Sequence, residues 1–179
     1  MISKNSIVTI GLLALVVLVP ACWNKKSTEI KLPASLYVLN VLNSEQYDEC
    51  HIPGSINVPF DKVADFAQDL DKESEVVCYC SNYQCTASGY AAKQLKELGF
   101  EHVCAYEAGM AEWYQQGLPV EGAIAHGAPA SDYLARVIEP DANALHDVSI
   151  ISTQALQEKL ICAGFLKGDD CCASPAPVA

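Results

Sequence analysis

The sequence predicts an α/β fold built on a parallel sheet, because short apolar runs alternate with segments of helical periodicity. The runs at 36–42, 75–80 and 102–106 are rich in Val, Leu, Tyr and Cys, which is typical of buried strands. Residues 61–70 and 86–100 instead gather apolar side chains on one helical face. Strands that alternate with helices along a chain usually pair in parallel.

The expected elements have recognisable starts and stops. Ser44 is expected to cap a helix over SEQYDE, and a short strand is expected at 56–58 inside a loop rich in Pro and Gly. Gly99 and Gly117 are expected to end the helices that precede them. The apolar face of the helix over 86–98 is expected to hold Ala87, Tyr90, Ala91, Leu95 and Leu98.

The first 22 residues indicate an export signal. Lys4 supplies a positive start, and the apolar stretch 7–19 is too short to span a membrane comfortably. Its ending, LVPAC, resembles a bacterial lipobox, in which the cysteine becomes a lipid-bearing first residue. We therefore expect lipidation of Cys22, a membrane anchor through that lipid, and an exported protein of the cell envelope facing the periplasm or the outside. The alternative is an uncleaved anchor with a chance cysteine.

Composition and charge bound the rest of the chain. The polar stretch 23–33 is expected to be a tether, 34–122 the folded domain, and 123–179 a small, mostly helical C-terminal extension with a disordered tail. The formal net charge of −11 argues against a nucleic-acid partner, since phosphate binding needs clustered Lys and Arg.

The stretch CYCSNYQCTAS, residues 78–88, carries the chemistry. It joins a strand to a helix whose first amides are unpaired, and a loop wrapped over that end makes an anion nest. Cys80, at the strand tip, is expected to face the nest with a lowered pKa and to act as a nucleophile. Cys78 is expected to be a buried filler. No metal site is expected, because C-x-C-x4-C lacks paired C-x2-C spacing, whereas a disulfide between Cys80 and Cys85 is conceivable.

Three motifs, in order, carry a resemblance to a known family. They are VLNVLNSEQYDECHIPGSINVP, VVCYCSNYQCTAS and AAKQLKELGFEHVCAYEAGMAEWYQQGLPVEG. Over about residues 34–122 the chain resembles the rhodanese (sulfurtransferase) family. That resemblance implies a parallel five-stranded sheet and a cysteine that accepts a sulfane sulfur as a persulfide and passes it on. Cys80 falls on the catalytic position, His51 in a bracing loop, and no cofactor is implied.

The loop also departs from the family pattern. Cys85 takes the usual Arg position, so anion binding would rest on amides, the helix dipole and neutral side chains. The expected anion-binding loop comprises Ser81, Asn82, Tyr83, Gln84, Cys85 and Thr86. Thiosulfate is thus less evident as the natural donor. A phosphatase relative binds phosphate through a bidentate Arg, so the absence of Arg from 80 to 100 argues against phosphatase activity. Cys85 is either a resolving thiol or a small filler of the Arg position.

The sequence therefore predicts a sulfurtransferase that carries sulfur as a persulfide on Cys80. Its expected partners are a small sulfur donor or a persulfide-bearing thiol. Two alternatives stay open: a periplasmic dithiol–disulfide redox protein that uses Cys80 and Cys85, and a non-catalytic rhodanese-like binding module.

Overall fold

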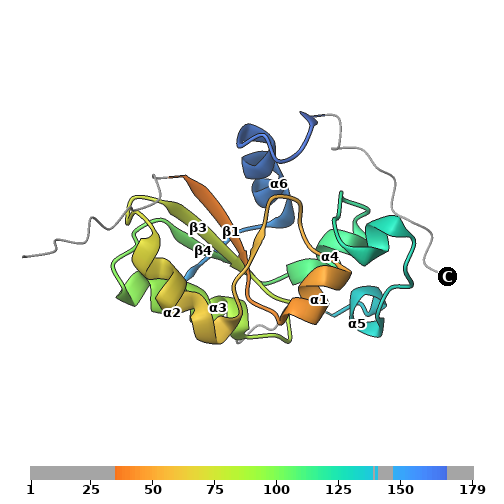
Figure 1. Ribbon diagram of the computed structural model, residues 1–179, viewed down its shortest axis with the longest axis horizontal. Helices are drawn as coiled ribbons and strands as arrows, with labels where there is room; N and C mark the ends of the chain where they lie inside the picture. Colours follow the sequence, from red (N-terminus) through yellow and green to blue (C-terminus); the bar gives the residue numbers. More distant parts are fainter. Residues whose placement is uncertain (1–34, 139, 141–146, 169–179) are drawn as a thin grey trace, which may run out of the picture.

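The computed structural model describes residues 35–138, 140 and 147–168, which fold around one parallel sheet (Figure 1). The sheet has five strands in the order β2-β1-β3-β4-β5. The strands are β1 (Leu36–Asn40), β2 (Ile56–Asn57), β3 (Glu75–Tyr79), β4 (Val103–Tyr106) and β5 (Ser149–Ile150), and each neighbouring pair is parallel. The predicted fold class, an α/β fold with a parallel five-stranded sheet, is confirmed.

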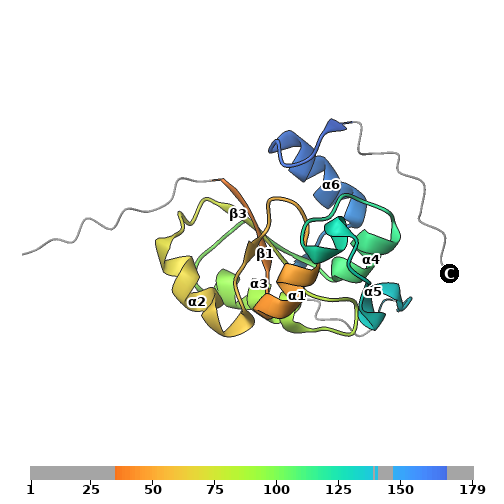
Figure 2. The same cartoon turned by 45° about the vertical axis from the view of Figure 1, so that its right-hand side comes forward.

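Helices lie on both sides of this sheet, as Figures 1 and 2 show from two directions. The α-helices are α1 (Ser44–Glu49), α2 (Val63–Phe66), α3 (Ala87–Glu97), α4 (Gly109–Gln115), α5 (Asp132–Ala135) and α6 (Thr153–Cys162). Short 3-10 turns at Phe60–Lys62 and Ala67–Asp69 flank α2, so the helix expected over 61–70 is broken into three pieces. Helices α2 and α3 occupy one side, and α4, α5 and α6 occupy the other.

Alternation along the strands divides the core into two layers. On β3, Val76 and Cys78 face the α2 and α3 side, whereas Val77 and Tyr79 face the α4 and α6 side. Successive side chains of a strand point to opposite faces, so a strand covered on both sides is apolar throughout. The near-continuous apolar runs of the sequence follow from this double burial.

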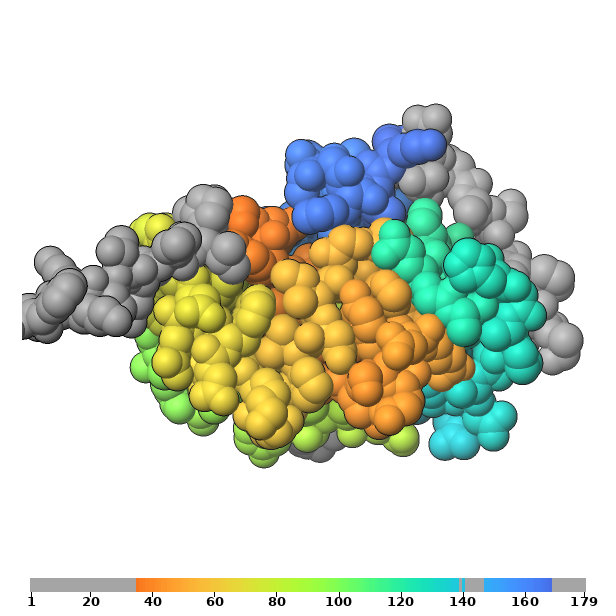
Figure 3. All heavy atoms as spheres, in the orientation of Figure 1, coloured from red at the N-terminus to blue at the C-terminus, as the bar shows by residue number. Residues whose placement is uncertain are grey.

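The segment expected to be an extension completes the sheet. Strand β5 pairs with β4 through Cys104 and Ala105, and Leu156 and Leu160 of α6 are fully buried in the second layer. Figure 3 shows α6, in blue, resting beside β1 and the loop that follows α1. The fifth strand of the sheet therefore comes from beyond residue 122, and α6 covers the face that β5 helps to form.

Two local expectations were wrong. The cap of α1 is Asn43, whose side-chain oxygen accepts the Gln46 amide at 2.9 Å, and Ser44 is the first helical residue. Tyr90 and Leu98 of α3 are 49% and 41% exposed, because the buried stripe runs through Ala91, Ala92 and Leu95 instead.

The expectations for the two ends of the chain lie outside the described residues. These are the signal peptide, Cys22, the tether and the tail at 169–179. Within the described part, no helix has both the length and the apolar character needed to cross a membrane.

Candidate active site in the two-cysteine loop

The candidate site is the loop 80–86, which joins the carboxyl end of β3 to the first turn of α3. Helix α4 fixes its base from the side. The amides of Met110 and Ala111 donate to the carbonyl oxygens of Cys80 and Ser81, each at 2.9 Å. These amides are among those that a helix start leaves without partners inside the helix. The first amides of α4 therefore hold the base of the loop in place.

Gly109 makes this contact between loop and helix feasible. Its φ is +64°, and a Cβ at this position would lie 2.6 Å from the Cys80 carbonyl oxygen and 2.7 Å from the Asn82 amide nitrogen. Only a residue without a side chain allows the two backbones to come this close. The path of the loop therefore depends on a residue far from it in sequence.

Asn82 holds the middle of the loop in a tight turn. Its side-chain oxygen accepts the Gln84 amide at 3.0 Å, and its carbonyl oxygen accepts the Cys85 amide at 2.9 Å. Asn82 is nearly buried, whereas Gln84 and Thr86 are exposed. Asn82 thus shapes the loop through its own side chain and carbonyl oxygen, and its predicted part in anion binding stays a prediction.

Cys80 lies beneath this turn, fully buried. Its Sγ is 2.9 Å from the Cys85 carbonyl oxygen and 3.3 Å from Ser88 Oγ. The hydrogen bond that its thiol makes to Cys85, together with burial, raises the pKa of Cys80 well above the ordinary thiol range. The expectation of a lowered pKa at Cys80 is therefore wrong for this conformation, because the interaction with the Cys85 side chain and burial both favour the protonated thiol.

Cys85 occupies the position that was expected for Cys80. It is half-buried, and four neighbouring groups lower the pKa of its thiol: the Cys80 side chain, the amides of Ala87 and Ser81, and the Ser81 side chain. The bond from Cys80 contributes most, and together these donors outweigh burial and lower the pKa of Cys85 to about 5. Cys85 therefore has the lowered pKa that was expected for Cys80, and the predicted anion nest stays a prediction.

Two buried cysteines, Cys78 and Cys50, show how the same side chain behaves without such donors. Cys78 and Cys50 are fully buried, and burial raises the pKa of each to about 12. Cys78 packs in the layer beneath α3, so its predicted role as a buried filler is confirmed. Among the described residues, no three Cys, His, Asp or Glu side chains are arranged to hold a metal ion.

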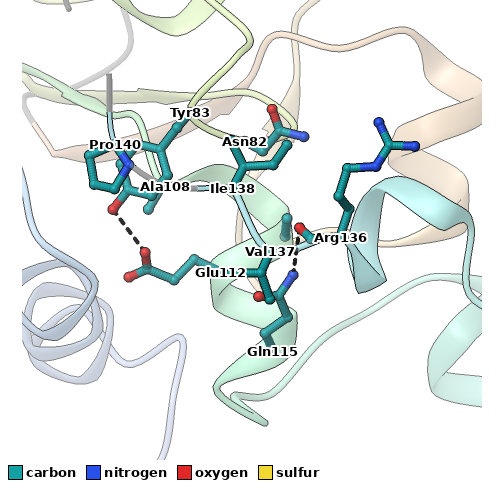
Figure 4. Close-up of a pocket in the computed structure, with 10 residues that line it drawn as sticks. Asn82, Tyr83, Ala108, Glu112, Gln115, Arg136, Val137, Ile138 and Pro140 are labelled. Carbon is teal, nitrogen blue, oxygen red and sulfur yellow. Dashed lines mark hydrogen bonds between the residues drawn. The ribbon is translucent and has the colours of Figure 1, made fainter. Parts of the chain in front are cut away.

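A cavity of about 220 Å³ lies beside the loop, on the α4 side (Figure 4). Asn82 and Tyr83 line it from the loop, Glu112 from α4, and Arg136 from the segment after α5. The Tyr83 hydroxyl donates to Glu112 Oε2 at 2.8 Å, which ties the loop to α4. Neither thiol of the loop lines this cavity, so it lies beside the loop and does not include the two cysteines.

Sequence reasoning missed Glu112 and Arg136 because nothing in their own segments marks them. Glu112 accepts from Tyr83 and also contacts Thr153 and Gln116, so its carboxylate links the loop to α6. Arg136 is the sole arginine in the sequence, and that rarity is the one signal that could have singled it out. Figure 4 shows its guanidinium directed away from the Glu112 carboxylate.

His51 and Trp113 have structural surroundings. His51 stacks on Tyr47, with ring centroids 3.8 Å apart, and its Nδ1 lies 2.7 Å from the Tyr47 carbonyl oxygen. Its Nε2 is 3.3 Å from a Glu121 carboxylate oxygen. Trp113 is fully buried and donates to the Pro119 carbonyl oxygen at 2.7 Å. The packing of Trp113 in the core is therefore confirmed, and His51 braces its loop without reaching either thiol.

Comparison with known proteins identifies similar sequences over the same part of the chain. A model of the rhodanese-like domain family matches residues 24–116, which is just over half of the sequence. A transcriptional regulator of the HTH type from Mycobacterium tuberculosis, Rv0324, is 37% identical over 92 residues, covering 50% of this chain and 40% of the regulator.

Two further matches have different lengths. The thiosulfate sulfurtransferase GlpE of Coxiella burnetii is 28% identical over 78 residues, covering 44% of this chain and 71% of that enzyme. The crystal structure of the BH2092 protein from Bacillus halodurans is 33% identical, with a TM-score of 0.47, and the match covers 50% of this chain and 65% of that one. The chain thus spans less than half of the regulator and about two thirds of the other two proteins.

Proposed function

This chain belongs to the rhodanese-like domain family, and from that premise we propose that it is a sulfurtransferase whose 80–86 loop takes up a sulfane sulfur as a persulfide. One observation carries the proposal: a strand-to-helix loop places a thiol among converging amide donors. Such a setting stabilises a thiolate before attack and a persulfide anion after it. The sulfurtransferase activity named for GlpE is consistent with this reading.

The proposed reaction has two steps. A loop thiolate attacks the outer sulfur of a donor such as thiosulfate, and a thiol or another nucleophile then removes that sulfur from the persulfide. The sequence assigns the persulfide to Cys80, which matches the cysteine position of the family. Cys80 is closed off in the resting conformation, so a donor reaches its sulfur only if the turn around Asn82 opens.

The first experiment measures sulfite release from thiosulfate by the full chain, together with the mass of the loop peptide. A sulfurtransferase releases sulfite in proportion to the protein, and the sulfur that leaves the donor is traced to the loop. A chain that releases no sulfite from thiosulfate, and takes up no sulfur from a polysulfide, would not be a sulfurtransferase. Such a chain would leave the binding module as the better account.

A dithiol–disulfide redox protein is the second candidate, and the contact between the Cys80 thiol and Cys85 favours it. A mild oxidant would then remove two hydrogens across Cys80 and Cys85 without any gain of sulfur. Peptide mapping after treatment with oxidised glutathione, without a sulfur donor, separates this reaction from sulfur transfer.

The cellular placement is also a proposal. We propose that Cys22 carries a lipid and anchors the domain at the cell envelope, and the support is the N-terminal sequence alone. Labelling with a fatty-acid analogue in a bacterial host should mark the wild type and leave Cys22→Ala unlabelled. Equal labelling of both proteins would remove Cys22 as the anchor.

A further inference from the structure

The two thiols of the loop differ in access to a donor. Cys80 is completely buried beneath the turn, whereas Cys85 is half-buried at the start of α3. A sulfur donor that approaches the closed loop therefore meets Cys85 first. Attack on Cys80 would require the Asn82 turn to open, which breaks the bonds that the Cys85 and Gln84 amides make to Asn82.

The hydrogen bonds around the two sulfurs have opposite polarity. The amides of Ser81 and Ala87 lower the pKa of Cys85, so both favour a negative sulfur there. Cys80 Sγ instead lies 2.9 Å from a carbonyl oxygen, which favours a protonated sulfur. Ser88 Oγ, at 3.3 Å, offsets this preference for the proton only in part. These contacts favour the charge on Cys85 and the proton on Cys80, whose Sγ lies against the Cys85 backbone.

We infer that Cys85 is the nucleophile that attacks the sulfane sulfur and that Cys80 is the thiol that resolves the resulting persulfide. The loop then releases sulfide and is restored by a dithiol reductant, so its substrate class is a sulfane-sulfur donor paired with a dithiol. This inference rests on the proposed sulfurtransferase function and reverses the roles expected from the order of the two cysteines.

The steps balance as follows, with thiosulfate as the donor. Cys85 thiolate attacks the outer sulfur, the S–S bond of thiosulfate breaks, and sulfite leaves with the electron pair. The sulfur of Cys80 then attacks Cys85 Sγ, the persulfide S–S bond breaks, and the outer sulfur leaves as hydrosulfide with the proton from Cys80. A disulfide between Cys80 and Cys85 remains. A dithiol reduces it through a mixed disulfide and is itself oxidised to a cyclic disulfide.

The test is a single turnover of the reduced full chain with thiosulfate, in the absence of free thiols. Sulfite and sulfide are both measured, and the mass of the loop peptide is then determined by mass spectrometry. Wild type should release both products and end with the Cys80–Cys85 disulfide. Cys80→Ser should release sulfite alone and keep one sulfur on Cys85, because its resolving thiol is absent. Cys85→Ser should lose sulfite release by at least about 100-fold, as expected when the attacking group is removed.

Cys104→Ser is the matched control, because Cys104 is a partly buried strand thiol away from the loop. It should behave as wild type, and circular dichroism should show that all three variants are folded. A sulfur retained on Cys80 in Cys85→Ser, with none taken up by Cys80→Ser, would overturn the assignment and leave the sulfurtransferase proposal intact. Wild type that holds a stable persulfide without releasing sulfide would overturn resolution. Wild type that releases no sulfite would refute the sulfurtransferase proposal itself.

Discussion

Cys78 and Cys85 lie seven positions apart in the sequence, yet their surroundings make them opposite kinds of thiol. Cys78 is on β3 between apolar side chains, and burial raises its pKa to about 12. Cys85 lies at the start of α3, where a neighbouring thiol and two amides lower its pKa to about 5. The fold thus lowers the pKa of a thiol by supplying hydrogen-bond donors, because burial alone raises it.

The largest expected effect is the difference in reactivity between these two thiols. At pH 7 Cys85 should be alkylated by iodoacetamide at least about 1,000-fold faster than Cys78, because the thiolate fractions differ by even more. The rate at Cys85 should stay nearly constant above pH 6 and fall as the pH drops through about 5, where the thiolate becomes protonated. Peptide mass spectrometry across the pH range measures both rates. A Cys85 that titrates near pH 8 or 9, like an ordinary thiol, would contradict the comparison.

The next effect concerns the glycine that lets α4 hold the loop. Gly109→Ala should lower the free energy of unfolding by about 3 kcal/mol or more, because strain at positive φ adds to a backbone collision. Gly99→Ala is the matched control, since Gly99 also has a positive φ, +91°, but nothing within 4 Å of a new Cβ. It should cost only about 1–2 kcal/mol.

Urea denaturation followed by tryptophan fluorescence measures both costs. Equal losses for the two variants would mean that the close approach at Gly109 has no energetic weight. In Gly109→Ala we also expect the fast alkylation of Cys85 to weaken, because the amide of Ser81 is no longer held in place.

A smaller effect should come from a single donor to Cys85. Ser81→Ala removes a hydroxyl that donates to the Cys85 sulfur and should raise the pKa of Cys85 by about one unit, which corresponds to one charge-assisted hydrogen bond. Ser88→Ala serves as the comparison, because Ser88 Oγ contacts Cys80 Sγ instead. The pH dependence of alkylation gives both values, and a larger shift in Ser88→Ala would reverse the assignment of donors.

The smallest effect is expected at Cys104, the partly buried thiol of β4. Burial raises its pKa, and Glu75 adds to this, although Lys159 lies near enough to act in the other direction. Lys159→Met breaks the 2.6 Å ion pair with Glu75 and should destabilise the protein by about 0.5 kcal/mol, as partly exposed pairs do. The pKa of Cys104 should rise slightly, and the alkylation profile of Cys85 should not change. A changed alkylation profile at Cys85 would mean that the ion pair between Lys159 and Glu75 affects the pKa of a thiol in the loop.

Local sequence pattern was enough to predict most of the fold. The apolar runs that became β1, β3 and β4 are covered on both faces, so their composition reports their place directly. Strand β5 is only Ser149–Ile150, and both residues are exposed, so no apolar run marked it. Its pairing with β4 comes from tertiary packing, which periodicity does not report.

The site could be predicted only as far as the loop. The motif predicted a nucleophilic sulfur and an anion nest at residues 80–86, and that loop holds two thiols whose pKa values are shifted in opposite directions. Which of the two thiols has the lower pKa depends on the backbone path of the loop. The amides of α4 and the close approach of Gly109 fix that path. Contacts between segments so distant in sequence leave no signal in the spacing of the two cysteines.

Strand β5 and helix α6 also limit when the protein can finish folding during its synthesis. The buried face built around Tyr106 and Trp113 stays open until Leu156 and Leu160 can cover it. During translation the family motifs emerge first, so the nascent chain displays its thiol loop and one bare side of its sheet together. That apolar side can be covered in full only after Leu166, the last residue of this layer, has left the ribosome.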